Sequence, residues 1–155
     1  MFGRFGFSDV LTLLLVMDSY VELYKGGIVP VADFVNMPYD RDILVRVIVK
    51  KTAAHYSYKS VRISKTDFPV LTCAAALTQE GVQAAVGARP AKAALVKDAE
   101  QLATLPMTAE KAQAFAEYAA GLLPTETNPR GSAAYRTHLI KVLTARCLTE
   151  LGGKA

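Results

Sequence analysis

The hydrophobic pattern of this chain changes its period along the sequence. Between residues 56 and 86, apolar residues alternate with polar ones or form short runs bounded by turn residues, which predicts β-strands. From residue 107 onward, apolar residues recur at helical spacing, and Phe115, Ala119 and Leu122 are expected to form the buried stripe of a helix. Strands followed by helices in one chain indicate an α+β fold, with the helices packed on the sheet.

Three segments form the predicted antiparallel sheet: YSYKSVRIS (residues 56–64), FPVLTCAAAL (residues 68–77) and Val82–Val86. Gly81 ends the turn TQEG between the last two segments, where a three-residue hairpin loop needs a positive φ. In the middle segment, Ala74 and Ala76 share one face of the strand. Their small size favours close packing of a helix on that face.

Two helices are predicted after this sheet. Thr108 is a suitable N-cap for the first helix, which Pro124 ends. Ser132 is a suitable N-cap for the second, and Gly152-Gly153 stops it. The second helix is expected to turn these residues inward: Tyr135, Leu139, Val142, Leu143 and Cys147. A shorter helix is predicted over residues 98–103.

The first 55 residues have a different pattern. It predicts a helix over Asp9–Ser19, a hairpin that turns at residues 25–27, a short helical turn over Asp33–Met37 and a strand over Ile43–Val49. The β-branched run of that strand is typical of a strand covered on both faces. We therefore predict an antiparallel three-stranded sheet packed on a C-terminal helical bundle, preceded by a β-rich part, with a compact boundary near residues 54–56.

Charge and composition exclude two classes of protein. The net charge is +4, and the 18 lysines and arginines are scattered, which argues against nucleic-acid binding. The apolar run Val10–Met17 is far shorter than the ~20 residues that cross a bilayer. Asp9 and Asp18 flank this run, so neither a membrane span nor a signal peptide is predicted.

Hydrophobic residues make up 52% of the chain, and a domain this apolar often meets another subunit.

The two cysteines, Cys73 and Cys147, each lie in an apolar segment. A zinc site needs three or four ligands, and an Fe–S cluster normally needs four cysteines. No metal site is therefore predicted. The cysteines are interpreted as buried, reduced thiols, as expected in the cytoplasm.

No catalytic residue is evident from the sequence. The two histidines, His55 and His138, are interpreted as surface or structural residues, and the carboxylates of Glu22, Asp40 and Asp42 show no convergent spacing. No phosphate-binding glycine motif is present. The residues alone therefore indicate no autonomous enzyme.

Two features favour the binding of a ligand. Ser8 and Asp9 begin a helix, where free backbone N–H groups attract anions such as a pyrophosphate and Asp9 could accept hydrogen bonds from sugar hydroxyls. The alternative is that both residues only cap the helix. Lys59 lies between Tyr56 and Tyr58, where it could lie along a planar ligand. Its alternative role is to protect an edge strand from association.

Several segments carry a resemblance to a known family. SVRISKTDFPVLTCAAAL, VGARPAKAALV and GSAAYRTHLIKVLTARCLTEL resemble the C-terminal domain of the FAD-binding subunit of molybdenum hydroxylases, the group of xanthine dehydrogenase and carbon monoxide dehydrogenase. FGRFGFSDVLTLLLVMDSYVEL, VPVADF and DILVRVIV are similar to the end of the FAD-binding domain that precedes it. The most specific motif is Gly131–Arg136. The resemblance implies that residues 1–55 are the end of a truncated, PCMH-like FAD-binding domain and residues 56–155 the C-terminal domain.

What the resemblance implies is an electron relay in the cytoplasm. Electrons would leave a substrate at a molybdenum site, cross Fe–S clusters and reach FAD and then an acceptor such as NAD, with molybdopterin and Fe–S clusters on partner chains. By position, Asp9 matches an aspartate that touches FAD, Leu44 a strand residue that lies against the cofactor, and Lys59 a lysine beside the flavin. The glycine-rich segment that wraps the FAD pyrophosphate would precede residue 1. This chain is therefore expected to hold a partial FAD site and to be inactive alone.

A function of a different class is the alternative: a non-enzymatic docking or assembly module with the same fold. The aromatic residues Phe2, Phe5 and Phe7 favour it, because an exposed apolar patch marks an interface. A homodimer through this N-terminal segment is a further expectation.

Overall fold

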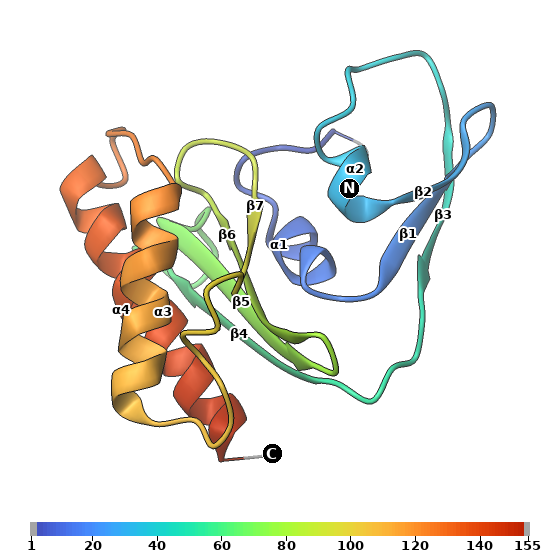
Figure 1. The fold of residues 1–155 in the computed structure, drawn as a ribbon. Helices are drawn as coiled ribbons and strands as arrows, with labels where there is room; N and C mark the ends of the chain where they lie inside the picture. The colour runs from blue at the N-terminus through green and yellow to red at the C-terminus, as the bar shows by residue number, and fades with distance from the viewer. Residues whose placement is uncertain (1–2, 154–155) are drawn as a thin grey trace.

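A computed structural model describes residues 3–153, so Phe2 lies outside the described residues. The chain forms four helices and seven strands within that range (Figure 1). In chain order they are α1 (Asp9–Leu15), β1 (Ser19–Leu23), β2 (Gly27–Pro30), α2 (Val31–Phe34), β3 (Leu44–Val49), β4 (His55–Val61), β5 (Leu71–Thr78), β6 (Gly81–Gly87), β7 (Ala94–Lys97), α3 (Ala109–Leu122) and α4 (Ala133–Gly152). The α+β class is confirmed. Among residues 3–153, no helix is long and apolar enough to span a membrane.

The N-terminal strands form a small antiparallel sheet in the order β2-β1-β3. Asp42 fixes its hairpin turn, since the carboxylate accepts hydrogen bonds from the backbone N–H groups of Lys25 (2.9 Å) and Gly26 (2.8 Å). Although desolvation opposes them, these bonds and one from the Ile43 N–H lower the pKa of Asp42. The predicted hairpin is therefore present, and a side chain just before β3 holds it.

The sheet beneath the helices has four antiparallel strands in the order β4-β5-β6-β7, rather than the three that were predicted. The additional strand, Ala94–Lys97, pairs with residues 83–86 of β6. Its sequence, ALVK, is too short to show an alternating pattern. Gly81 has a φ of +117° at the β5–β6 turn, as the turn prediction required.

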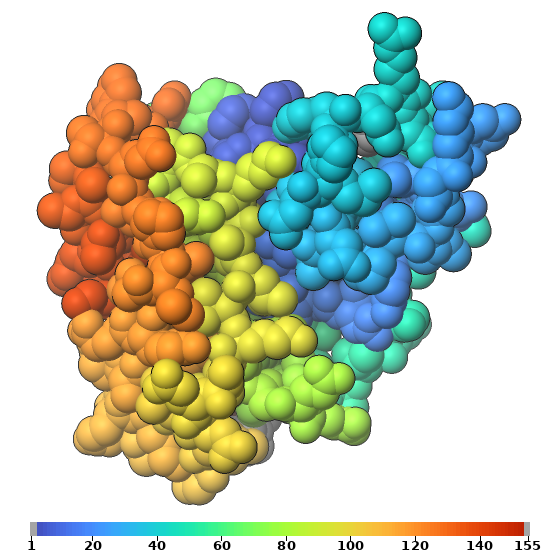
Figure 2. All heavy atoms as spheres, turned by 45° about the horizontal axis from the view of Figure 1, so that its top comes forward, coloured from blue at the N-terminus to red at the C-terminus, as the bar shows by residue number. Residues whose placement is uncertain are grey.

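The two faces of this four-stranded sheet carry two separate hydrophobic cores. Cys73 and Ala75 point toward α3 and α4, whereas Ala74, Ala76 and Ala85 point toward α1. Figure 1 shows the helical pair on one side of the sheet and α1 on the other, with the small sheet beyond α1. In Figure 2 the helices (orange to red) and the N-terminal residues (blue to cyan) lie on opposite sides of the green and yellow strands and loops. The alanines bring α1 close to the sheet, as predicted.

One glycine decides how closely α1 approaches the sheet. The Thr12 and Thr72 hydroxyl groups form a buried hydrogen bond of 2.9 Å between α1 and β5. A Cβ atom on Gly87 of β6 would overlap both hydroxyl oxygens. The absence of a side chain at Gly87 therefore makes room for this buried contact.

The Gly131–Arg136 motif has a structural explanation. Ser132 caps α4, because its Oγ accepts a hydrogen bond from the Tyr135 N–H (3.1 Å). The guanidinium of Arg136 is fully buried and donates to the carbonyl oxygens of Val70 (3.0 Å) and Glu126 (2.7 Å). It also donates to the Gly131 carbonyl and to Asn128 Oδ1. Arg136 therefore fixes the loop between the two long helices, and burial lowers its pKa.

Four further expectations from the sequence are corrected. Strand β3 is an edge strand with exposed valines, not a strand covered on both faces. Leu122 and Tyr135 are exposed rather than inward, at 54% and 45%. Residues 98–103 form a turn in which the Asp98 carboxylate accepts from the Leu102 and Ala103 N–H groups, so no helix forms there. Finally, α1 ends at Leu15 instead of residue 19, because the chain enters β1.

Candidate functional site

Asp9, one of the predicted site residues, lies in a cluster of charged and polar side chains. The Tyr58 hydroxyl donates to Asp9 Oδ1 at 2.6 Å, and Arg62 Nη2 donates to the same oxygen at 2.6 Å. Asp9 begins α1, whereas Tyr58 and Arg62 belong to β4 and the residue that follows it. Burial and the bond to Asp9 raise the pKa of the Tyr58 phenol, and the same carboxylate raises the pKa of Arg62. We name these three residues the Asp9 cluster.

The Asp9 cluster adjoins a group of exposed aromatic rings. Arg62 Nη1 donates to the Asp67 carbonyl at 2.6 Å, and Phe68 follows Asp67 in the chain. The Phe68 and Phe7 rings lie 4.4 Å apart, and Phe7 stacks on Phe5 at 5.3 Å. All three rings are 43–59% exposed. The Asp9 cluster and the three phenylalanine rings therefore form one continuous surface that has both charged and apolar groups.

Ser8 caps α1, as the alternative interpretation of the Ser8-Asp9 pair proposed. Its Oγ accepts a hydrogen bond from the Leu11 N–H at 3.2 Å. Helix α1 has only seven residues, and the carboxylate of Asp9 sits in its first turn. A short helix with a carboxylate at its start attracts phosphate poorly. Asp9 is better suited to accept hydrogen bonds from hydroxyl groups.

Lys59 lies on the opposite face of the sheet from the Asp9 cluster. Its Nζ is 2.8 Å from Glu150 Oε2 on α4, and the Ser57 hydroxyl donates to the same oxygen at 2.9 Å. The hydrogen bond to Glu150 raises the pKa of Lys59. Because side chains alternate along a strand, Tyr56 and Tyr58 do not flank Lys59 on one face. The lysine is on edge strand β4, as its alternative role requires.

Leu44 is the third predicted site residue, and it lies in the small sheet. It begins β3, pairs with Leu23 and is partly buried at the margin of the core that α1 shares with both sheets. The structure therefore does not bring Asp9, Leu44 and Lys59 together as one group of side chains.

The two cysteines are free and buried, as predicted. The Cys73 Sγ lies 3.5 Å from the Thr144 hydroxyl, and a hydrogen bond with Cys147 together with burial raises the pKa of Cys73. Among residues 3–153, no group of three or more His, Cys, Asp or Glu side chains is arranged to hold a metal ion.

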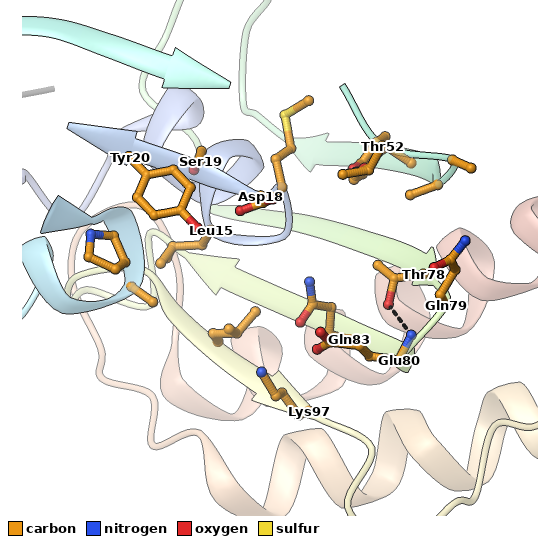
Figure 3. A pocket seen from close by; sticks show the side chains of 17 residues that line it. Leu15, Asp18, Ser19, Tyr20, Thr52, Thr78, Gln79, Glu80, Gln83 and Lys97 are labelled. Carbon is orange, nitrogen blue, oxygen red and sulfur yellow. Dashed lines mark hydrogen bonds between the residues drawn. The ribbon is translucent and has the colours of Figure 1, made fainter. Parts of the chain in front are cut away.

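A cavity of about 450 Å³ opens between the two sheets beyond the end of α1. Tyr56, Gln83 and Lys97 lie in one row across the four-stranded sheet and line it. Figure 3 shows Asp18, Ser19 and Tyr20 on one side of the opening and Glu80, Gln83 and Lys97 on the other. Gln83 Nε2 donates to the Val16 carbonyl at 3.1 Å. None of the three predicted site residues lines this cavity.

The sequence interpretation missed Tyr58 and Arg62 as partners of Asp9. The alternating pattern of β4 contained part of the signal, since it places Tyr58 on the face opposite Lys59. The helix that this face contacts is far away in sequence, however, so the partner could not be identified. The chain is therefore an α+β module. One of its surfaces carries the Asp9 carboxylate and the Arg62 guanidinium, next to exposed phenylalanine rings.

Comparison with family models identifies this module. Residues 56–151 match the CO dehydrogenase flavoprotein C-terminal domain. This match covers more than half of the chain, and the chain therefore belongs to that family. A comparison with curated proteins found no match.

Solved structures confirm the fold over almost the whole chain. The chain of quinoline 2-oxidoreductase from Pseudomonas putida 86 matches with a TM-score of 0.80 at 20% identity, covering 98% of this chain and 58% of that one. Carbon monoxide dehydrogenase from Hydrogenophaga pseudoflava matches with a TM-score of 0.84 at 18% identity, covering 99% and 59%. Carbon monoxide dehydrogenase from Oligotropha carboxidovorans matches with a TM-score of 0.79 at 20% identity, covering 99% and 59%. This chain thus spans less than two thirds of the chains that it matches.

Proposed function

We propose that this chain is the C-terminal portion of a flavin subunit. The subunit would pass electrons from the molybdenum and Fe–S centres of partner chains to FAD and then to an acceptor such as NAD, as in a xanthine dehydrogenase-like oxidoreductase. The observation that carries the proposal is the family match over residues 56–151. We further propose that residues 1–55 are the end of the FAD-binding domain and residues 56–155 the C-terminal domain, located in the cytoplasm, which the reduced cysteines favour.

The residues of this chain fit one part of a FAD site. Asp9 offers an exposed carboxylate that can accept hydrogen bonds from sugar hydroxyls, and the nearby rings of Phe7 and Phe68 offer apolar contact. In β4, an edge strand, the outer main-chain groups are open to a ligand, while Glu150 holds the Lys59 ammonium. The redox chemistry in such a subunit is supplied by bound FAD, whereas these side chains bind and orient it.

The remaining part of the site is proposed to lie on a segment that corresponds to the unmatched part of the related chains. The cavity beside Phe7 and Phe68 is about 150 Å³, whereas ligand pockets are typically about 300–1,000 Å³. The larger cavity contains none of Asp9, Leu44 and Lys59. We therefore expect the chain to be inactive alone and to work with an N-terminal FAD-binding segment and with molybdenum and Fe–S subunits or domains.

A titration of the purified chain with FAD tests this proposal. Amide chemical shifts in NMR spectra detect weak binding, and they should move at Asp9 and along β4 with a Kd above about 100 µM. Stoichiometric, submicromolar binding by this chain alone would contradict the partial site. Unchanged amide shifts at these positions in millimolar FAD would contradict any cofactor role.

The second candidate function is a docking module without a cofactor role. It is favoured by the exposed rings of Phe5, Phe7 and Phe68, which form a patch typical of an interface. Alanine substitutions of Asp9 and Lys59 in the assembled complex separate the two functions. Unchanged flavin content and acceptor reduction would favour docking, and a loss of either would favour the cofactor role. Sedimentation velocity of the chain alone shows whether the patch forms a homodimer.

A further inference from the structure

The cavity between the two sheets has a polar floor on a face that is otherwise alanine-rich. The side-chain row that follows Ala74 and Ala85 toward the β5–β6 turn is mostly polar. In register order this row consists of Tyr56, Ala76, Gln83 and Lys97. Helix α1 ends at Leu15, and the cavity of about 450 Å³ opens between this row and the small sheet. Its volume is that of a typical pocket for a small ligand, which is about 300–1,000 Å³.

Apolar side chains line the same cavity. Leu15, Met17 and Leu95 are among its lining residues, and all three pack in the core that α1 shares with both sheets. Figure 3 shows Leu15 beside Tyr20, across the opening from Gln83 and Lys97. A ligand in this cavity would therefore meet apolar surface on one side and polar groups on the other.

Two charged groups of opposite sign line the cavity without a partner. In the part of the chain that the structure describes, neither the Glu80 carboxylate nor the Lys97 ammonium forms a hydrogen bond or an ion pair. The other lining carboxylate, that of Asp18, lies 3.9 Å from Lys50 Nζ. Figure 3 shows Glu80 and Lys97 on the same side of the opening. The open charges of the cavity are therefore one anion and one cation.

We propose that this cavity binds a small zwitterion with an apolar side chain, of the type of a free α-amino acid. The Glu80 carboxylate accepts hydrogen bonds from the ligand's ammonium, and the Lys97 ammonium donates to its carboxylate. The apolar side chain lies against Leu15 and Met17. This inference does not depend on the proposed flavin function, since Asp9, Leu44 and Lys59 do not line the cavity.

The charges of the cavity argue for a zwitterion over an ion of one sign. A simple carboxylate would gain an ion pair with Lys97 but would be repelled by Glu80, and a simple amine would meet the reverse. A ligand with both charges satisfies both groups. Gln83 lies directly opposite Lys97 in the register of β6 and β7, and its amide is fixed by the hydrogen bond from Nε2 to the Val16 carbonyl (3.1 Å). A fixed amide beside the charged groups restricts the orientation of the ligand.

The test is an NMR titration of the full chain with L-leucine and three matched probes. Isocaproate is leucine without its ammonium, isoamylamine is leucine without its carboxylate, and glycine lacks the apolar side chain. L-Leucine should move the amide signals of Glu80, Gln83 and Lys97 with a Kd of about 0.1–5 mM. Each of the other three probes should bind about 3- to 10-fold more weakly, because each lacks one of the three contacts.

Two substitutions show which charge each group recognises. Lys97→Met and Glu80→Gln should each weaken the binding of L-leucine about 3- to 10-fold. Lys97→Met should not weaken the binding of isoamylamine, and Glu80→Gln should not weaken that of isocaproate. Lys65→Met and Glu100→Gln, at exposed positions outside the cavity, are the matched controls and should leave the binding of L-leucine unchanged.

Three results would overturn the proposal. The first is that L-leucine at about 50 mM, well above the expected Kd, moves no amide signal of the lining residues. The second is that all four probes bind equally well. The third is that Lys97→Met and Glu80→Gln bind L-leucine as the wild type and the two controls do.

Discussion

The two sheets of this molecule differ in how deeply their apolar residues are buried. In the four-stranded sheet, the central strands are covered on both faces, and Cys73, Ala75 and Ala84 are fully buried. In the three-stranded sheet, the outer strand β3 leaves Val45, at 54% exposure, and Val47, at 38%, open on one face. The other face of this sheet carries polar contacts, such as the Glu22–Arg46 ion pair.

This difference shows which of the two sheets has both faces covered by other elements of the chain. The pair of helices α3 and α4 covers one face of the four-stranded sheet, and α1 covers the other. Strand β3 presents valines and an unpaired edge, the combination that normally requires a covering partner. The small sheet is therefore the part of this chain whose apolar residues the described residues leave exposed.

The largest effect is expected at the loop that Arg136 fixes. Arg136→Met should lower the free energy of unfolding by about 3–5 kcal/mol, because one buried and three partly buried acceptors lose their donor. Urea denaturation measures it. Arg146→Met, at an exposed position of the same helix, should change stability by no more than about 0.5 kcal/mol. Equal effects of the two substitutions would contradict the structural role of the motif.

A smaller loss is expected where α1 meets the four-stranded sheet. Gly87→Ala should cost about 1–3 kcal/mol, because its methyl group would displace the Thr12 and Thr72 hydroxyls. Gly121→Ala in α3 is the control, since a Cβ atom there meets nothing and should stabilise the helix by about 0.5–1 kcal/mol. In thermal unfolding, Gly87→Ala should lower the melting temperature and Gly121→Ala should raise it. A neutral Gly87→Ala would show that α1 does not pack tightly on this sheet.

One substitution made in both sheets tests the comparison directly. Val86→Thr, in the covered sheet, should cost about 1–3 kcal/mol, because the hydroxyl is buried among apolar groups. Val47→Thr, in the small sheet, should change stability by at most about 0.5 kcal/mol while it reduces the binding of a hydrophobic dye. Comparable losses at the two sites would mean that both sheets are equally covered in solution.

The smallest effect concerns the hairpin of the small sheet and depends on pH. Because the pKa of Asp42 is lowered in the folded chain, its contribution to stability is present above the ordinary value of 3.8 and lost as the pH falls through the folded value. Asp42→Asn should therefore be less stable than wild type at pH 6, and the gap should close below pH 3.8. Urea midpoints measured across this range check it. A gap that stays constant with pH would assign the effect to another cause.

The sequence predicts correctly those parts of the fold that depend on contacts between residues a few positions apart. The caps Thr108 and Ser132 and the turn at Gly81 are all confirmed, because each depends on residues within a few positions. Strand β7 was missed, since it has only four residues and owes its pairing to β6. The exposure of β3 was missed for a related reason: a β-branched run looks the same whether its cover is present in the chain or not.

The candidate site shows the same limit. The sequence proposes Asp9 as a site residue, whereas its contacts with Tyr58 and Arg62 connect residues separated by about fifty positions and depend on how α1 lies across the sheet. The interpretation of Lys59 beside two tyrosines neglected the alternation of side chains along β4. The roles of Asp9, Leu44 and Lys59 toward FAD stay predictions.

The core between α1 and the sheets contains residues from both sides of the boundary proposed at residues 55 and 56. Leu11 and Val21 pack in the same cluster as Ala74, Ala76 and Ala85. A fragment that starts at Tyr56 would lack α1, which covers these alanines, and would expose one face of its sheet to water. The stretch that the family model matches, residues 56–151, therefore lacks the helix that covers one face of its sheet, and deletions meant to isolate the C-terminal domain should keep α1.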